Sequence, residues 1–130
     1  MARGVPRPDS DIDLLIVAAD LPRGRLARVA EFDAVEERVA SDLAAAAAAG
    51  IHTRLSPVFK TPEELEFGSP LLLDMTEHVL VLHDRDGLLE RRLERLRTRL
   101  RELGSKRVNR GGGYYWVLKP NYQPGDIIEL

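Results

Sequence analysis

Apolar positions recur with two different spacings along the first 60 residues, which predicts a strand, a helix and a second strand. Asp11–Ala19, DIDLLIVAA, is a short apolar run with Ile and Val, opened by two carboxylates, which favours a buried strand. From about Arg25 to Ala49 apolar residues recur every three or four positions, which predicts a helix that ends at Gly50. Ile51–Phe59, IHTRLSPVF, is expected to form the second strand, with Pro57 at an edge or bulge.

Two short helices and a third strand are expected next. Thr61 is followed by a proline and, three residues on, by Glu64, the residue order of a helix N-terminus. A Ser-Pro pair at 69–70 opens a second short helix to about Glu77. Val79–His83, VLVLH, is a continuous apolar run that predicts a third buried strand.

The last third of the chain predicts a long helix and a hairpin. Asp86–Leu103 carries leucines at alternating four- and three-residue steps, a seam that must pack on a sheet or on another chain, and Gly104 ends it. Lys106–Asn109 and Tyr114–Leu118 are expected to pair around three glycines. The fold class predicted from these elements is α/β or α+β, a small mixed sheet flanked by helices, with a long C-terminal helix and a hairpin and tail.

Composition narrows the class of protein. The chain has 130 residues, of which 44% are apolar and 31% charged, values typical of one compact domain. It has no cysteine, which excludes a disulfide framework and a zinc-thiolate site. No window approaches about 18 apolar residues, and the charged N-terminus has no signal-peptide core, so a cytoplasmic protein without membrane contact is expected.

Charge is divided unevenly along the chain. Residues 1–84 have a net charge of −7 and residues 85–110 a net charge of +6. Nucleic acid is one partner that such a basic segment suits, and a solvated helix face beside an acidic body is the interpretation we favour. The aromatic stretch Tyr114–Trp116 either stacks on the bases of a single-stranded nucleic acid or covers the core, and the second interpretation is the one we favour. The basic residues concerned are Arg92, Arg95, Arg99, Arg101, Arg107 and Arg110.

Paired carboxylates at the first strand are the candidate chemistry. Residues two apart on a strand point to the same face, so Asp11 and Asp13 are expected to lie together. Two carboxylates suit Mg²⁺, whose other ligands would be water and phosphate oxygens, and Arg3 and Arg7 lie close enough in sequence to neutralise a triphosphate. The alternative is an acidic strand start in a solvated turn. The histidines at 52, 78 and 83 have no metal-ligand spacing.

The stretch 2–17, A-R-G-x-x-R-x-x-S-D-I-D-L-L-I-V, resembles the active-site signature of the minimal nucleotidyltransferases of the polymerase-β-like superfamily. That signature is Gly-Ser-x-Ala-Arg-Gly, a short spacer, Ser-Asp-x-Asp and an apolar strand. The next helix and strand also follow the family's order, so the resemblance covers about the first 60 residues. Two departures are a Gly-Ser that would precede Met1 and the lack of a third carboxylate at 51–59, where His52, Arg54 and Ser56 stand instead.

The resemblance implies a fold, an activity and a site. Asp11 and Asp13 would be the catalytic residues and the Mg²⁺ ligands, and Arg3, Gly4 and Ser10 would support the nucleotide loop. A nucleoside monophosphate would pass from a nucleoside triphosphate to a hydroxyl of a protein or small acceptor. Either the natural reading frame starts upstream of Met1, or the chain has lost its phosphate turn and transfers nucleotide weakly or not at all.

A second function class follows from the same resemblance. The alternative is a non-catalytic interaction module, an antitoxin-like subunit that binds a helical partner of the HEPN type. In either case residues 1–104 are expected to form the nucleotidyltransferase-like domain, incomplete at its N-terminus, with the hairpin and tail of 105–130 packed on it. An uncovered edge at the first strand predicts a homodimer, or a C-terminal tail folded back onto that edge.

Overall fold

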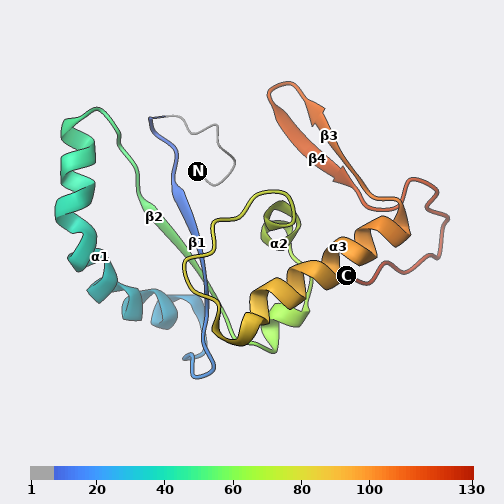
Figure 1. Cartoon of the computed structure of the whole chain (residues 1–130), viewed down its shortest axis with the longest axis horizontal. Coiled ribbons are helices and arrows are strands. Elements are labelled where there is room, and N and C mark those ends of the chain that lie inside the picture. The colour runs from blue at the N-terminus through green and yellow to red at the C-terminus, as the bar shows by residue number, and fades with distance from the viewer. Residues whose placement is uncertain (1–7) are drawn as a thin grey trace. The chain divides into compact units, whose positions relative to one another are not determined.

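The computed structural model describes residues 8–130 and divides the chain into two compact units, one ending at Glu66 and the other beginning at Phe67 (Figure 1). Arg3, Gly4 and Arg7 lie outside the described residues. The mixed helix and strand content confirms the expected fold class. The expected boundary between residues 104 and 105 stays a prediction.

The first unit is a strand–helix–strand arrangement. β1 (Ile12–Val17) and β2 (Leu55–Lys60) form a parallel pair in which Ile12 lies opposite Leu55 and Val17 opposite Lys60. α1 (Arg25–Ala48) connects them, as a parallel pair requires a crossover rather than a tight turn. The predicted first strand and helix are confirmed to within two residues, whereas β2 begins at Leu55, four residues after the predicted start at Ile51.

α1 packs on the strand pair through one aromatic contact. The rings of Phe32 and Phe59 meet edge to face with centroids 5.9 Å apart, and Phe32 is 3% exposed. Leu26, which belongs to the expected apolar seam, is 87% exposed. Leu26 lies six residues before Phe32 and so about 120° around the helix from it, away from the side that meets Phe59. A two-stranded sheet therefore covers only part of the helix.

The segment after β2 forms a single 3₁₀ turn, Glu64–Glu66, where a short helix is expected. Its start has the reciprocal bonds of a capping box: the Glu64 N–H donates to Thr61 Oγ1 at 3.1 Å, and the Thr61 N–H donates to Glu64 Oε2 at 3.3 Å. Leu65 inside this turn is fully buried. The predicted start is thus confirmed.

The second unit is built around two helices. α2 (Pro70–Met75) begins at Ser69, whose Oγ accepts from the Leu72 N–H at 3.3 Å. A 3₁₀ turn, Arg85–Gly87, leads into α3 (Leu88–Leu103), which ends at Gly104 with a φ of 72°. The buried apolar side chains of the unit come from both helices: Leu72, Leu73, Leu93, Leu96 and Leu100.

The third strand expected at Val79–His83 is wrong. These residues have no regular secondary structure, and Leu80 and Leu82 are 74% and 78% exposed. A short apolar run carries no information on whether a neighbouring strand is available to pair with its backbone. Each sheet in the described part of the chain consequently has two strands.

The second sheet is a hairpin of β3 (Lys106–Arg110) and β4 (Gly113–Val117). Its two-residue turn is formed by Gly111 and Gly112, with φ of 57° and 82°, the left-handed values that such a turn requires. The hairpin contacts α2, since Trp116 Nε1 donates to Asp74 Oδ1 at 3.4 Å. Across residues 8–130, every helix is too short or too polar to cross a bilayer.

Candidate functional site

The loop before β1 is fixed against the residues that lead into β2. The His52 N–H donates to the Pro8 carbonyl at 2.8 Å, and Thr53 Oγ1 donates to the Ser10 carbonyl at 2.6 Å. The Ile12 N–H donates to the Arg54 carbonyl at 2.8 Å, which extends the pairing below the first register pair. Hydrogen bonds therefore join the residues that lead into the two strands, and Ser10 takes part through its carbonyl group.

Asp11 and Asp13 lie at this hydrogen-bonded start of the β1–β2 sheet. Asp13 is the second residue of β1 and Asp11 immediately precedes the strand. Both are exposed, whereas Ile12 between them is half-buried. This alternation of exposure is that of a strand with one solvent-facing side. A cation shared by the two carboxylates stays a prediction.

The strand register identifies the neighbours of the two carboxylates. Asp13 lies opposite Ser56, and Arg54 precedes Leu55 as Asp11 precedes its partner Ile12. Opposed residues of a parallel pair share a face, so Ser56 borders Asp13 and Arg54 borders Asp11. The face therefore carries two carboxylates, one hydroxyl and one guanidinium.

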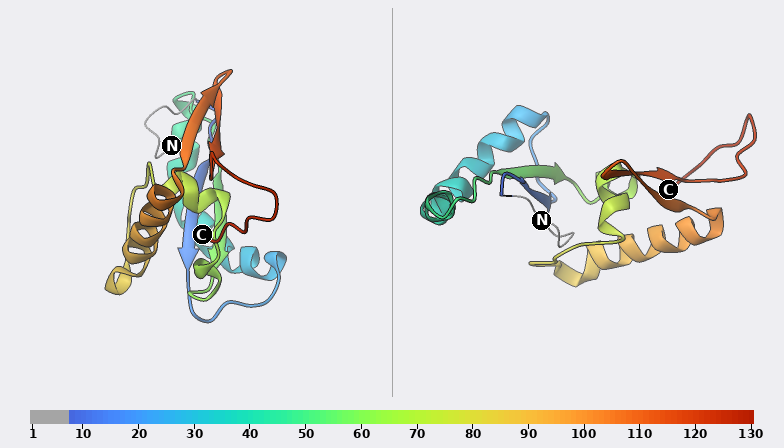
Figure 2. Two further views of the ribbon diagram at one scale, coloured as in Figure 1. Left: turned by 90° about the vertical axis from the view of Figure 1, so that its right-hand side faces the viewer. Right: turned by 90° about the horizontal axis from the view of Figure 1, so that it is seen from above.

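This polar face is the one that α1 leaves open. Phe59, which meets Phe32 of α1, is three residues from Ser56 and so projects from the opposite side of β2. Figure 2 shows the ribbons of α1 and of the strand pair, and the alternation of side chains along the strands places the carboxylates on the side that does not meet Phe32. A ligand can reach them without any movement of α1.

The donor set fits a hard divalent cation bound through few protein ligands. Carboxylate and hydroxyl oxygens are the ligands that Mg²⁺ prefers, and Mg²⁺ keeps several waters or phosphate oxygens. Asp11, Asp13 and Ser56 supply oxygens of this kind on one face. No group of three or more His, Asp or Glu side chains converges within the described residues, so a third carboxylate is not supplied there.

A second charged cluster closes the other end of the sheet. Arg28 of α1 donates through Nη1 and Nη2 to the two carboxylate oxygens of Glu64, both at 2.8 Å, and through Nη1 to the Phe59 carbonyl at 3.2 Å. The hydrogen bond from Arg28, followed by that from the Thr61 N–H, lowers the pKa of Glu64 to about 2. Each group has its partners, so this cluster holds α1, β2 and the 3₁₀ turn together.

The sequence alone could not show two of these contacts. No local sequence pattern predicts that Arg28 pairs with Glu64, because the two residues are 36 positions apart and meet only once α1 packs on the strands. Ser56 is visible as a polar residue on the second strand, but its place opposite Asp13 depends on the register. The apolar alternation along β2, LSPVF, gives the faces of the strand and not its alignment with β1.

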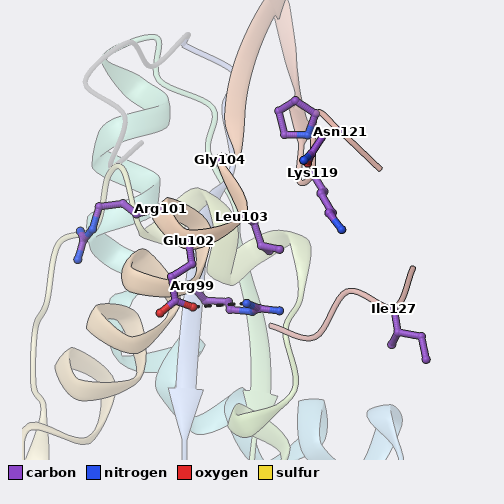
Figure 3. A pocket seen from close by; sticks show the side chains of 9 residues that line it. Arg99, Arg101, Glu102, Leu103, Gly104, Lys119, Asn121 and Ile127 are labelled. Carbon is purple, nitrogen blue, oxygen red and sulfur yellow. Dashed lines mark hydrogen bonds and ion pairs between the residues drawn. The ribbon is translucent and has the colours of Figure 1, made fainter. Parts of the chain in front are cut away.

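A hollow of about 600 Å³ in the second unit is lined by the end of α3 and the chain after β4 (Figure 3). Its cations are already partnered. Arg99 Nε donates to the Glu129 carbonyl at 2.9 Å, and Lys119 pairs with Asp126 at 2.5 Å, which holds the pKa of Asp126 below its ordinary value. Satisfied pairs of this kind indicate a structural role.

Comparison with known proteins gives one informative relative. No protein-family model matches the chain, and no solved structure matches it. Over 98 residues the chain is 29% identical to a protein of Methanocaldococcus jannaschii named "Putative protein adenylyltransferase MJ1305". The match covers 74% of this chain and 61% of that protein, so the chain spans about three fifths of the length of this curated relative. The similarity supports a nucleotidyltransferase-like relationship.

Proposed function

We propose that the β1–β2 sheet is the core of a nucleotidyltransferase site, which transfers a nucleoside monophosphate from a nucleoside triphosphate to a hydroxyl of a protein or small acceptor. The observation that carries the proposal is the pair of exposed carboxylates, Asp11 and Asp13, on the face that α1 leaves open. The similarity to a protein named as an adenylyltransferase supports the same chemistry.

The residues of the open face would divide the work by charge. Asp11 and Asp13 would hold Mg²⁺, which when bound neutralises phosphate oxygens and orients the triphosphate. Arg54, beside Asp11 in the register, would pair with phosphate oxygens through its planar guanidinium. The Ser56 hydroxyl would donate a hydrogen bond to a phosphate oxygen or accept one from water.

The proposed reaction is a substitution at the α-phosphorus. The acceptor hydroxyl oxygen forms a bond to the α-phosphorus, and the bond from that phosphorus to the oxygen bridging to the β-phosphate breaks. Pyrophosphate leaves with the bonding electron pair, and the hydroxyl proton passes to water. The protein's contribution in this scheme is position and charge, since the reaction needs no covalent intermediate on the chain.

Titration calorimetry with a non-hydrolysable ATP analogue and Mg²⁺ tests the binding half of the proposal. Asp13→Asn should weaken binding by more than about tenfold, because a neutral amide loses the charge that holds the cation. Asp42→Asn, an exposed position on α1, is the matched control and should leave binding unchanged. Equal affinities for all three proteins would count against the site.

Labelled ATP tests the transfer half. Incubation of the chain with Mg²⁺, α-labelled ATP and candidate acceptor proteins should attach label to a protein, and the label should remain on that protein after denaturation. Asp11→Asn should abolish the labelling. γ-labelled ATP should give none, since the γ-phosphate leaves within pyrophosphate. Label from the γ-position would instead indicate phosphoryl transfer.

The polar character of β2 favours a second candidate, a nucleotide-binding interaction module without transfer. The strand has Arg54 before it and Ser56 within it, and no carboxylate to draw a proton from an acceptor hydroxyl. Such a module would act by binding, with a HEPN-type helical protein or a second copy of the chain as its partner. Analogue binding that depends on Asp13, together with no labelled product, would support this candidate over the first.

A further inference from the structure

One face of the β3–β4 hairpin combines an aromatic ring with two basic side chains. Tyr115 lies opposite Val108, which is two residues from both Lys106 and Arg110. Opposed residues and residues two apart share a face, so Tyr115, Lys106 and Arg110 project from the same side. All three are exposed, and the side chain of Tyr115 stands between the two cations along the strand.

The opposite face of the hairpin is occupied within its own unit. The guanidinium of Arg107 lies 4.3 Å from the centroid of the Tyr114 ring, and Trp116 Nε1 donates to Asp74. The aromatic stretch is therefore divided: Tyr114 and Trp116 have these partners on one face, whereas Tyr115 lies on the other face and is 46% exposed.

Charge on the hairpin is of one sign. Residues 105–118 contain three basic residues and no carboxylate. Within residues 8–130, Lys106 and Arg110 have no carboxylate within ion-pair distance, in contrast to Lys119, which pairs with Asp126. The exposed face thus presents uncompensated positive charge on both sides of an aromatic ring.

We propose that this face binds single-stranded nucleic acid, with Tyr115 stacked on a base and with Lys106 and Arg110 on flanking phosphates. Aromatic platforms beside cations are the means by which proteins hold single strands without reading their sequence. Arg110 is four positions after Lys106 on β3, a rise of about 13 Å, and the ring lies between them. An acidic peptide would satisfy the cations but would leave the ring without a flat partner.

This inference stands apart from the proposed nucleotidyl transfer. The hairpin belongs to the second unit and the carboxylate pair to the first, so variants of one surface leave the other chemically intact. Nucleic-acid binding that survives Asp13→Asn, and Mg²⁺-nucleotide binding that survives Tyr115→Ala, would show that the two surfaces act separately. Loss of both properties in either single variant would contradict this separation.

Fluorescence anisotropy of a labelled 12-nucleotide single-stranded RNA of mixed sequence, titrated with the full chain, tests the aromatic contact. Tyr115→Ala should weaken binding by about 5- to 150-fold, because a stacked base is lost, and Tyr115→Phe should retain the affinity. Tyr122→Ala is the matched control, since Tyr122 is 51% exposed in the same unit but outside the hairpin. A wild-type chain that fails to bind at low salt would overturn the proposal.

Salt dependence tests the two cations. The slope of the log association constant against log salt concentration is negative, and the double variant Lys106→Gln/Arg110→Gln should make it less steep by about 1.4, the amount for two phosphate contacts on a single strand. The control double variant Arg23→Gln/Arg38→Gln removes two exposed arginines of the first unit and should leave the slope unchanged. An equal change in both double variants would mean unspecific attraction. Competition by polyglutamate as effective as that by RNA would also overturn the proposal.

Discussion

Residues 8–130 form two sheets of two strands each, which differ in strand direction, in connection and in the charge of their exposed side chains. The β1–β2 pair is parallel, needs α1 to connect it and presents Asp11 and Asp13 on its open face. The β3–β4 pair is antiparallel, needs two glycines to connect it and presents Lys106 and Arg110. The number of strands in a sheet therefore says little about its chemistry, which depends on the residues that occupy the uncovered face.

The largest expected effect concerns the core that supports the basic hairpin. Leu96 of α3 is fully buried, so Leu96→Ala should lower the free energy of unfolding by about 3 kcal/mol through lost apolar contacts and a cavity. Urea denaturation followed by circular dichroism measures it. Leu82→Ala is the contrasting variant: at 78% exposure it should change stability by less than about 0.5 kcal/mol. A large loss of unfolding free energy in Leu82→Ala would contradict the exposed position of Leu82 and with it the absence of a buried strand at Val79–His83.

The acidic sheet can be made more acidic at a defined place. Ser56→Asp would put a third carboxylate opposite Asp13, on a strand about 4.8 Å away, and should tighten Mg²⁺ binding by about tenfold. Calorimetry with Mg²⁺ alone measures this change. Val58→Asp adds the same charge to the same face two residues on, opposite Leu15, and should have little effect. Equal gains at both positions would point to a general charge effect.

The connection that follows the acidic sheet depends on one hydroxyl. Thr61→Ala removes the side chain that accepts the Glu64 N–H, and should cost about 1 kcal/mol of unfolding free energy. Thr61→Ser keeps the hydroxyl and should recover most of that loss in thermal denaturation. Similar melting temperatures for the alanine and serine variants would show that the methyl group, and not the cap, stabilises the turn.

Acid should weaken the first unit through Glu64. Its pKa is lowered from 4.5 to about 2 in the folded chain, so its stabilising contribution is present above pH 4.5 and is lost as the pH falls towards 2. The unfolding free energy of Glu64→Gln should therefore depend less on pH across this window than that of the wild type. Glu63→Gln, at the exposed neighbouring position, should retain the wild-type slope.

Local signals predicted most of the fold. The cap at Ser69, the stop at Gly104 and the glycine turn of the hairpin depend on residues within a few positions of one another, and the structure has each of them. The strand predicted at Val79–His83 is wrong because a strand needs a partner strand from elsewhere in the chain, and these residues have none. Four or five apolar residues describe a preference and do not specify a neighbour.

The candidate site was predictable in its residues and not in its surroundings. The spacing of Asp11 and Asp13 marks two carboxylates on one side of a strand. Nothing local places Ser56 opposite Asp13 or leaves their face uncovered, since both depend on the parallel register and on the side to which α1 packs. The same limit applies to Tyr115, whose exposure follows from its place on the hairpin face opposite to Trp116, the residue that contacts Asp74.

The turn at Gly111 and Gly112 also affects the order in which the two sheets are expected to form during folding. A hairpin closed by two adjacent residues can form in about 1–10 μs, before distant segments meet. Ile12 finds Leu55 only after the whole of α1 has been spanned, which carries the larger loop-closure entropy. The β3–β4 hairpin is therefore expected to reach its native register early in refolding, before the β1–β2 sheet has formed.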